Sequence, residues 1–180
     1  MVTSLAAFFV GACVLAQDNV NPQTEALKDF EKRISDYVSL EGNLAKGLSA
    51  MKQTTEPQTI IDRQHELAKK LREARSQAQQ GAIFSPEITR EFRRLIGIAM
   101  RGQSSVDVKK SLSRAEPVRL TLHVNDAYPS NVPLQSTPPS ILMNLPRLPP
   151  ELEYRIAGHA LVLRDTSANI VVDLIPDAIP

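Results

Sequence analysis

Residues 152–175 read LEYRIAGHALVLRDTSANIVVDLI and carry three apolar runs in quick succession. Apolar and polar side chains alternate over Leu152–Ile156, as in a half-buried strand, and two further strands are expected over Ala160–Arg164 and Ile170–Ile175. Two groups of turn-forming residues separate the runs: Ala157-Gly158-His159 and Asp165-Thr166-Ser167-Ala168-Asn169. This segment therefore predicts a small antiparallel β-meander, which must pack against another element because so short a sheet is marginal alone.

Residues 17–116 have helical spacing instead. Asn21 and Pro22 form a cap followed by proline at the first helical position. A heptad seam follows, with Glu41 as its only break: Leu27, Phe30, Ile34, Tyr37, Leu44, Leu48 and Met51. Gly42 and Gly47 each lower helix stability by about 1 kcal/mol relative to Ala. The long helix must therefore pack on a partner.

Further helices are expected within the same region. A second opens at Thr55-Glu56-Pro57-Gln58 and ends near Gly81, with the seam Ile60, Gln64, Leu67, Leu71, Ala74 and Ala78. A third opens at Ser85-Pro86-Glu87 and ends near Gly102, burying Ile88, Phe92, Leu95, Ile96 and Ala99. A short fourth helix would run from Ser104 or Ser105 to Arg114. The short link between the first two helices favours an antiparallel hairpin or bundle.

Residues 117–180 change period and composition. Alternation over 118–124 predicts a half-buried strand directly after Pro117. Residues 126–150 hold seven of the chain's 13 prolines, which predicts an extended, irregular connector. Four apolar residues are expected to pin its middle to the core: Ile141, Leu142, Met143 and Leu145. The expected fold class is α+β, with helices, a Pro-rich connector and a β unit that packs on the helices.

The first 16 residues are typical of a signal peptide. Leu5–Ala16 contains no charged residue and is too short to span a bilayer, which needs about 20 residues. Val14 and Ala16 suit a cleavage site before Gln17, although no Lys or Arg precedes the apolar stretch. Two alternatives remain: lipidation of Cys13 within Val10-Gly11-Ala12-Cys13, which would anchor the chain in a membrane, or a buried N-terminal helix.

Composition narrows the function classes. The 180 residues are 42% hydrophobic with a net charge of +1, which excludes a disordered chain and gives no electrostatic reason for a nucleic-acid partner. Aromatic residues make up only 4%, and a single Cys excludes an internal disulfide framework. Residues 17–116 carry a net charge of +3 and residues 117–180 carry −2. Basic residues cluster on the second and third helices: Lys69, Lys70, Arg72, Arg75, Arg90, Arg93, Arg94 and Arg101. Helix solubilisation accounts for them better than an anionic partner does.

No catalytic, cofactor-binding or metal-ligating motif is present. His65, His123 and His159 fall on a helix, a strand and a turn without ligand spacing. The GxSxG elbow and both Gly-rich phosphate loops are absent. Asp165 and Asp173 flank the last hairpin and are interpreted as turn formers or as partners of two arginines, Arg155 and Arg164. We therefore assign no catalytic, cofactor or metal site and expect no enzyme.

Glu41 places a carboxylate inside a hydrophobic seam. It either reaches solvent beside Gly42 or meets a cation from the partner helix, where it would set the register of the pair. Alternatively, the seam ends near Leu40 and resumes on a shifted face.

The segment LEYRIAGHALVLRDTSANIVVDLIPDAIP, preceded by VPLQSTPPSILMNLPRLPP, resembles the C-terminal part of uncharacterised bacterial exported proteins. The likeness covers about residues 117–180, and it implies export and a β module without a known reaction. The β-hairpin ending also looks like those of small periplasmic stress or metal-homeostasis proteins.

These observations predict an exported, non-catalytic binding or structural protein of the bacterial cell envelope, periplasmic or extracellular. Its partner would be a second copy, through the Leu27–Met51 seam, or an envelope protein. The alternatives are an envelope enzyme or accessory subunit with a site where helices meet the sheet, and a periplasmic stress or metal-homeostasis factor.

Overall fold

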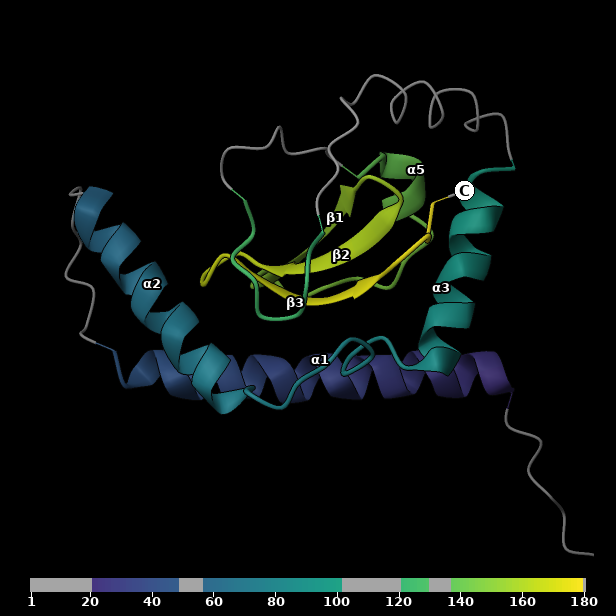
Figure 1. Cartoon of the computed structure of the whole chain (residues 1–180). Coiled ribbons are helices and arrows are strands. Elements are labelled where there is room, and N and C mark those ends of the chain that lie inside the picture. Colours follow the sequence, from purple (N-terminus) through teal and green to yellow (C-terminus); the bar gives the residue numbers. More distant parts are fainter. Residues whose placement is uncertain (1–20, 49–56, 102–120, 130–136, 180) are drawn as a thin grey trace, which may run out of the picture.

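The computed structural model describes residues 21–48, 57–101, 121–129 and 137–179, and Figure 1 shows its helices and sheet. The elements in chain order are α1 (Pro22–Lys46), α2 (Pro57–Ala74), α3 (Pro86–Ala99), α5 (Pro139–Leu142), β1 (Leu152–Ala157), β2 (Ala160–Asp165) and β3 (Ile170–Ile175). The strands form one antiparallel sheet in the order β1-β2-β3, which confirms the predicted α+β class and the meander. The predicted signal peptide, Cys13, Met51 and the fourth helix lie outside the described residues.

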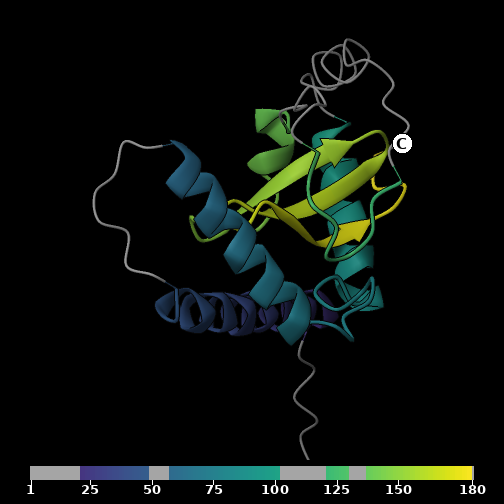
Figure 2. The ribbon, with the colours of Figure 1, turned by 60° about the vertical axis from the view of Figure 1, so that its left-hand side comes forward.

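The three long helices lie beneath and on either side of the sheet. α1 runs beneath it, while α2 and α3 each contact α1 and rise on either side of the sheet (Figure 1). Figure 2 shows the same arrangement after rotation, with α2 crossing α1 obliquely. One sheet face therefore lies over helices.

Helix starts follow the predicted capping chemistry. The Asn21 side chain accepts a hydrogen bond from the N–H of Gln23 at 3.0 Å, and Pro22 occupies the first turn. The Ser85 hydroxyl accepts one from the N–H of Ile88. Each cap thus satisfies one of the N–H groups that have no partner within the first turn of its helix.

An aromatic cluster joins α1, α3 and β1. The rings of Phe30 and Phe92 lie 4.9 Å apart between centroids, and Phe84 lies 5.2 Å from Phe92. Phe92 also meets the ring of Tyr154 on β1, with the centroids at 6.0 Å. These contacts continue into a single core that includes the helix-facing side of the sheet.

The predicted seam of α1 is largely correct. Phe30, Ile34, Tyr37 and Leu48 are buried, and Leu44 packs against the core. The prediction that Leu27 belongs to the seam is wrong, because Ala26 is buried in the core and Leu27 is only partly buried. These seam residues belong to the core that the chain forms with its own α3 and sheet.

The predicted seam of α2 is only partly correct. Leu67 and Leu71 are buried, but Ile60 is 49% exposed, Ala74 faces solvent, and Ala68 is buried instead. The first turns of α2 extend past the sheet (Figure 1), and Ile60 and Ile61 in these turns are 49% and 42% exposed. α2 ends at Ala74 rather than near Gly81, and the following residues form a loop on β3.

Residues 121–129 cover the outer face of the sheet. The predicted strand is wrong in its described part: 121–123 are irregular, and the chain turns at Val124-Asn125, where Asn125 has φ +70°. The Asp126 carboxylate accepts the N–H of His123 and stabilises this turn. Tyr128 nevertheless packs on Val162, Val171 and Leu174, and Ala127 forms a single bridge to β3.

Residues 137–149, which we call the strap, cross the free side of β1. Ile141 and Leu145 are buried, as predicted. Leu142 and Met143 are not, with exposed fractions of 43% and 86%. The short helix α5 explains the difference, because it turns only Ile141 toward α3.

Candidate functional site

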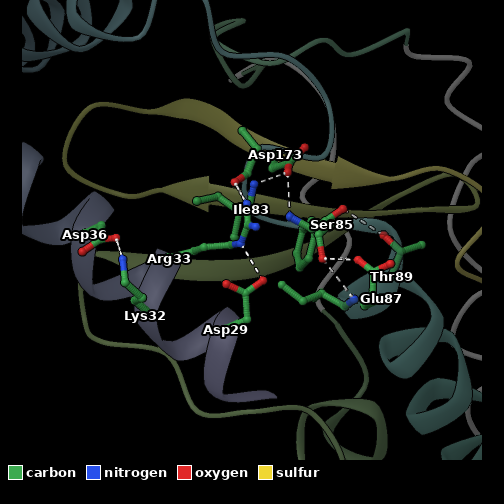
Figure 3. A network of polar contacts seen from close by, with 12 residues as sticks. Asp29, Lys32, Arg33, Asp36, Ile83, Ser85, Glu87, Thr89 and Asp173 are labelled. Atoms are coloured by element: carbon green, nitrogen blue, oxygen red, sulfur yellow. Dashed lines mark hydrogen bonds and ion pairs between the residues drawn. The ribbon is translucent and has the colours of Figure 1, made fainter. Parts of the chain in front are cut away.

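Asp173 anchors the loop between α2 and α3. β3 pairs Asp173 with Leu163 and Val171 with Arg164, so Val172 is an extra residue in the strand. Such a bulge turns consecutive side chains to the same face, and here it brings Asp173 to the helix side of the sheet. The fully buried carboxylate accepts the N–H groups of Gly81, Ile83 and Phe84 at 2.8 to 3.2 Å (Figure 3).

Asp165 binds α1 rather than an arginine. The Tyr37 hydroxyl donates a hydrogen bond of 2.7 Å to Asp165 Oδ2, and the N–H of Ala168 donates to Oδ1 at 2.7 Å. Burial raises the pKa of Asp165 above its ordinary range, although these hydrogen bonds oppose the rise. Burial and the neighbouring carboxylate also raise the pKa of Tyr37, so this phenol stays protonated.

Arg75, directly after α2, contacts α1, the sheet and residues 121–129. Its guanidinium carbon lies 5.0 Å from the centre of the Tyr37 ring, within cation–π range. Its Nη1 donates to the side chain of Asn125 at 2.9 Å, and its Nη2 donates to the carbonyl of Val172 at 2.8 Å. Burial lowers the pKa of Arg75. The groups with shifted pKa values at this junction thus bind one another and hold the helices, the sheet and residues 121–129 together.

Glu41 is buried, with an exposed fraction of 6%, so it does not reach solvent. Burial raises its pKa, and the nearby carboxylates of Asp165 and Glu151 raise it further. A hydrogen bond with Ser167 and the positive charge of Arg63 on α2 act in the opposite direction. The seam thus continues through Glu41 instead of ending at Leu40, and the carboxylate faces the turn between β2 and β3.

The histidines stay apart. His65 is exposed on α2, and the His123 ring lies 3.2 Å from Asp126. His159 bonds the carbonyl of Ile179 through Nδ1 at 2.8 Å. Within the described ranges, no group of His, Cys, Asp and Glu side chains could hold a metal ion, and no helix is long and apolar enough to cross a membrane.

Several basic side chains serve the fold. Arg72 donates to the carbonyl of Asn125 and Lys70 to that of Gly47, and Arg93 donates to the carbonyl of Pro176. Arg94 pairs with Glu91 and Arg101 donates to the carbonyl of Gly97. Lys69 and Arg90 are exposed.

Glu153 forms ion pairs with Arg155 and Arg164, so the predicted pairing of these arginines with Asp165 and Asp173 is wrong. Arg155 Nη2 lies 2.6 Å from Glu153 Oε2, and Arg164 Nη1 binds the other oxygen. Although burial acts to raise the pKa of Glu153, its bonds to both arginines hold that pKa below the ordinary range. The three side chains, from β1 and β2, sum to one positive charge on the outer face of the sheet.

The strap and β1 enclose a surface groove of about 420 Å³, which we call the strap groove. Its apolar wall consists of side chains from both segments: Leu142, Pro146, Leu148, Leu152 and Tyr154. Its charged lining is Glu153, Arg155 and Arg147. The Nε–H of Arg155 is buried and donates to no acceptor among the described residues.

A second groove, of about 310 Å³, lies between α1 and the strap, and we call it the helix groove. Phe30, Ile34 and Val38 recur at four-residue spacing along its floor, and Pro149 closes its far side. Arg147 lines this groove as well. The two grooves therefore share Arg147 in their linings.

Arg147 has no counter-ion in the described part of the chain, where neither a hydrogen bond nor an ion pair engages its guanidinium. Sequence reasoning missed it because it belongs to no motif. A signal existed, since Arg147 is the only charged residue between Asp126 and Glu151. A lone cation in a long apolar, Pro-rich segment marks a candidate anion anchor.

Comparisons with models of protein families, with characterised proteins and with solved structures gave no match to this chain.

Proposed function

We propose that this protein is an exported, non-catalytic binding protein of the bacterial cell envelope, and that its ligand occupies the strap groove and the helix groove. Export rests on the uncharged stretch Leu5–Ala16 and on the small residues at its end, Val14 and Ala16. The binding role rests on the grooves.

One observation carries the proposal: two apolar grooves share an arginine that has no counter-ion in the described chain. Ligand sites are concave and mostly apolar, with a few polar groups that orient the ligand, and they usually exceed about 300 Å³. Both grooves meet this description. Leu142, which lines the strap groove, is 43% exposed, and the next residue, Met143, is 86% exposed.

The side chains that line the two grooves favour a binding role over catalysis. Arginine stays protonated in proteins, so Arg147 and Arg155 can hold an anion but cannot take up a proton at neutral pH. Glu153 already accepts two arginines. At the buried junction, the Tyr37 hydroxyl and Asp165 are bonded to each other, which supports a structural role for that cluster.

The packing of the α1 seam in the core determines whether a second copy of the chain could bind there. The α1 seam lies within the chain's own core, so a second copy could reach it only if α1 separated from α3 and the sheet. We therefore place the binding surface at the grooves instead.

Titration of the purified chain with Nile red, a neutral apolar dye, tests the proposal. We expect saturable binding at one site. Ser35 is exposed at the helix groove, so Ser35→Trp should fill that groove and weaken dye binding by about tenfold or more, which corresponds to about 1.4 kcal/mol.

Thr59→Trp provides the control, because Thr59 is exposed on α2 away from both grooves. This variant should bind the dye as the wild type does. Absence of saturable dye binding, or equal binding by Ser35→Trp and the wild type, would refute the proposed site.

A further inference from the structure

We propose that the ligand is a fatty-acid-type carboxylate, an unbranched hydrocarbon chain ending in one carboxylate. This inference rests on the proposed function and specifies the chemistry of its ligand. It follows from the charge of the strap groove, from the shape and lining of both grooves, and from the bonding of the backbone around them.

The charge of the strap groove selects an anion. Its lining contains Arg147, Arg155 and Glu153, a net charge of +1, and Arg164 neutralises part of Glu153 from outside the lining. Arg147 and the buried Nε of Arg155 have no acceptor in the described chain. A planar carboxylate can bind a guanidinium through two parallel hydrogen bonds, so it fits the exposed guanidinium of Arg147.

The carboxylate belongs in the strap groove rather than the helix groove. Glu31 lines the helix groove and would repel a second negative charge there. Arg147 lies between the grooves and can hold the anion while the methylene stem of its side chain covers the hydrocarbon. The chain would then extend from Arg147 over Phe30, Ile34 and Val38 in the helix groove.

The backbone around the grooves favours a hydrocarbon over a peptide. The floor of the helix groove is α1, whose main-chain N–H groups are used within the helix, and Pro149 opposite it has none. A peptide main chain would lose its water partners in the helix groove with few replacements, whereas a hydrocarbon loses none.

Calorimetric titration with decanoate, below its micelle concentration, tests the inference on the full chain. We expect decanoate to bind at least about tenfold more tightly than decanol or decyltrimethylammonium, because only decanoate can pair with Arg147. Arg147→Gln should remove this preference and leave decanol binding unchanged. Arg90→Gln makes the same charge change at an exposed site outside the grooves and should leave both affinities unaltered.

The outcomes separate the two proposals. Equal affinity for decanoate and decanol, or an unchanged preference in Arg147→Gln, would overturn the carboxylate while leaving an apolar binding site. Tighter binding of acetyl-Leu-Leu-Leu with a free carboxyl end would assign the grooves to a peptide terminus. A dimer in sedimentation that decanoate does not dissociate, with no decanoate bound, would assign them to a second copy. Failure of every probe, Nile red included, would overturn the proposed function too.

Discussion

The hydroxyl of Tyr37 on α1 donates a 2.7 Å hydrogen bond to the buried carboxylate of Asp165 at the end of β2. The two residues are 128 positions apart in the chain, so this bond fixes α1 against the sheet. A buried hydrogen bond to a charged group contributes about 1.5 to 3 kcal/mol, more than one between neutral groups.

Tyr37→Phe should lower the free energy of unfolding by about 1.5 to 3 kcal/mol, because it leaves one Asp165 oxygen buried without a donor. Urea unfolding measures the change. Tyr154→Phe is the matched control, since that hydroxyl donates to the neutral, partly buried carbonyl of Pro146 and should contribute only about 0.5 to 1.5 kcal/mol. Equal losses in the two variants would contradict a special role for the Tyr37–Asp165 bond.

Asp173→Ala should be more damaging. The substitution removes the acceptor of the N–H groups of Gly81, Ile83 and Phe84. Each buried donor left unpaired lowers the free energy of unfolding by about 1 to 3 kcal/mol. We expect a loss of about 3 kcal/mol or more in urea unfolding. Asp36→Ala, which removes only an exposed ion pair with Lys32, should change stability by less than about 1 kcal/mol.

Stability should decline as the pH rises above the ordinary carboxyl range, near pH 4. The pKa values of Asp165 and Glu41 are raised in the folded chain, mainly by burial, so the folded state holds more protons than the unfolded state. The free energy of unfolding is then largest below the ordinary pKa and falls until the pH passes the raised values.

Glu41→Gln should flatten that decline, because the amide cannot ionise. Urea unfolding of the variant and the wild type at several pH values between about 4 and 7 measures the slopes. Glu73→Gln, on an exposed position of α2, should keep the wild-type slope. A wild-type stability that rises through this range, or an identical slope in Glu41→Gln, would show that the Glu41 carboxyl does not behave as its burial implies.

Two glycines should respond oppositely to alanine. At Gly42, inside α1, an added Cβ meets no atom within 4 Å, so Gly42→Ala should stabilise the chain by about 0.5 to 1 kcal/mol. Gly81 has φ +94°, a conformation that L-residues rarely adopt, and Gly81→Ala should destabilise the loop around Asp173. Thermal melting separates the two, and a rise in melting temperature for both would contradict the assigned backbone of Gly81.

Local patterns predicted the regular elements well. The prolines at 22, 57 and 86 each lie at the start of a helix, because proline has its φ preset there and lacks only an N–H that would have no partner. The three short apolar runs within 152–175 and the turn-forming residues between them predicted the strands and both turns for a similar reason, since strand and turn preferences depend on local geometry.

Features that depend on three-dimensional context were not predictable. The extra residue at Val172 turns Asp173 toward the α2–α3 loop, and no local pattern marks such a bulge. The predicted Arg155 and Arg164 pairings failed because both residues lie across the sheet from the two aspartates, beside Glu153. The grooves require the strap to pack beside both α1 and β1, which residue spacing does not encode.

Nuclear Overhauser effects between decanoate and the methyl groups of the chain test the central claim most directly, because they locate the hydrocarbon. The grooves predict cross-peaks from its methylene protons to Leu142, Leu148 and Val38. Cross-peaks to Ile60 and Ile61, the exposed apolar pair at the start of α2, would place the ligand elsewhere, and cross-peaks to no methyl group would contradict binding altogether.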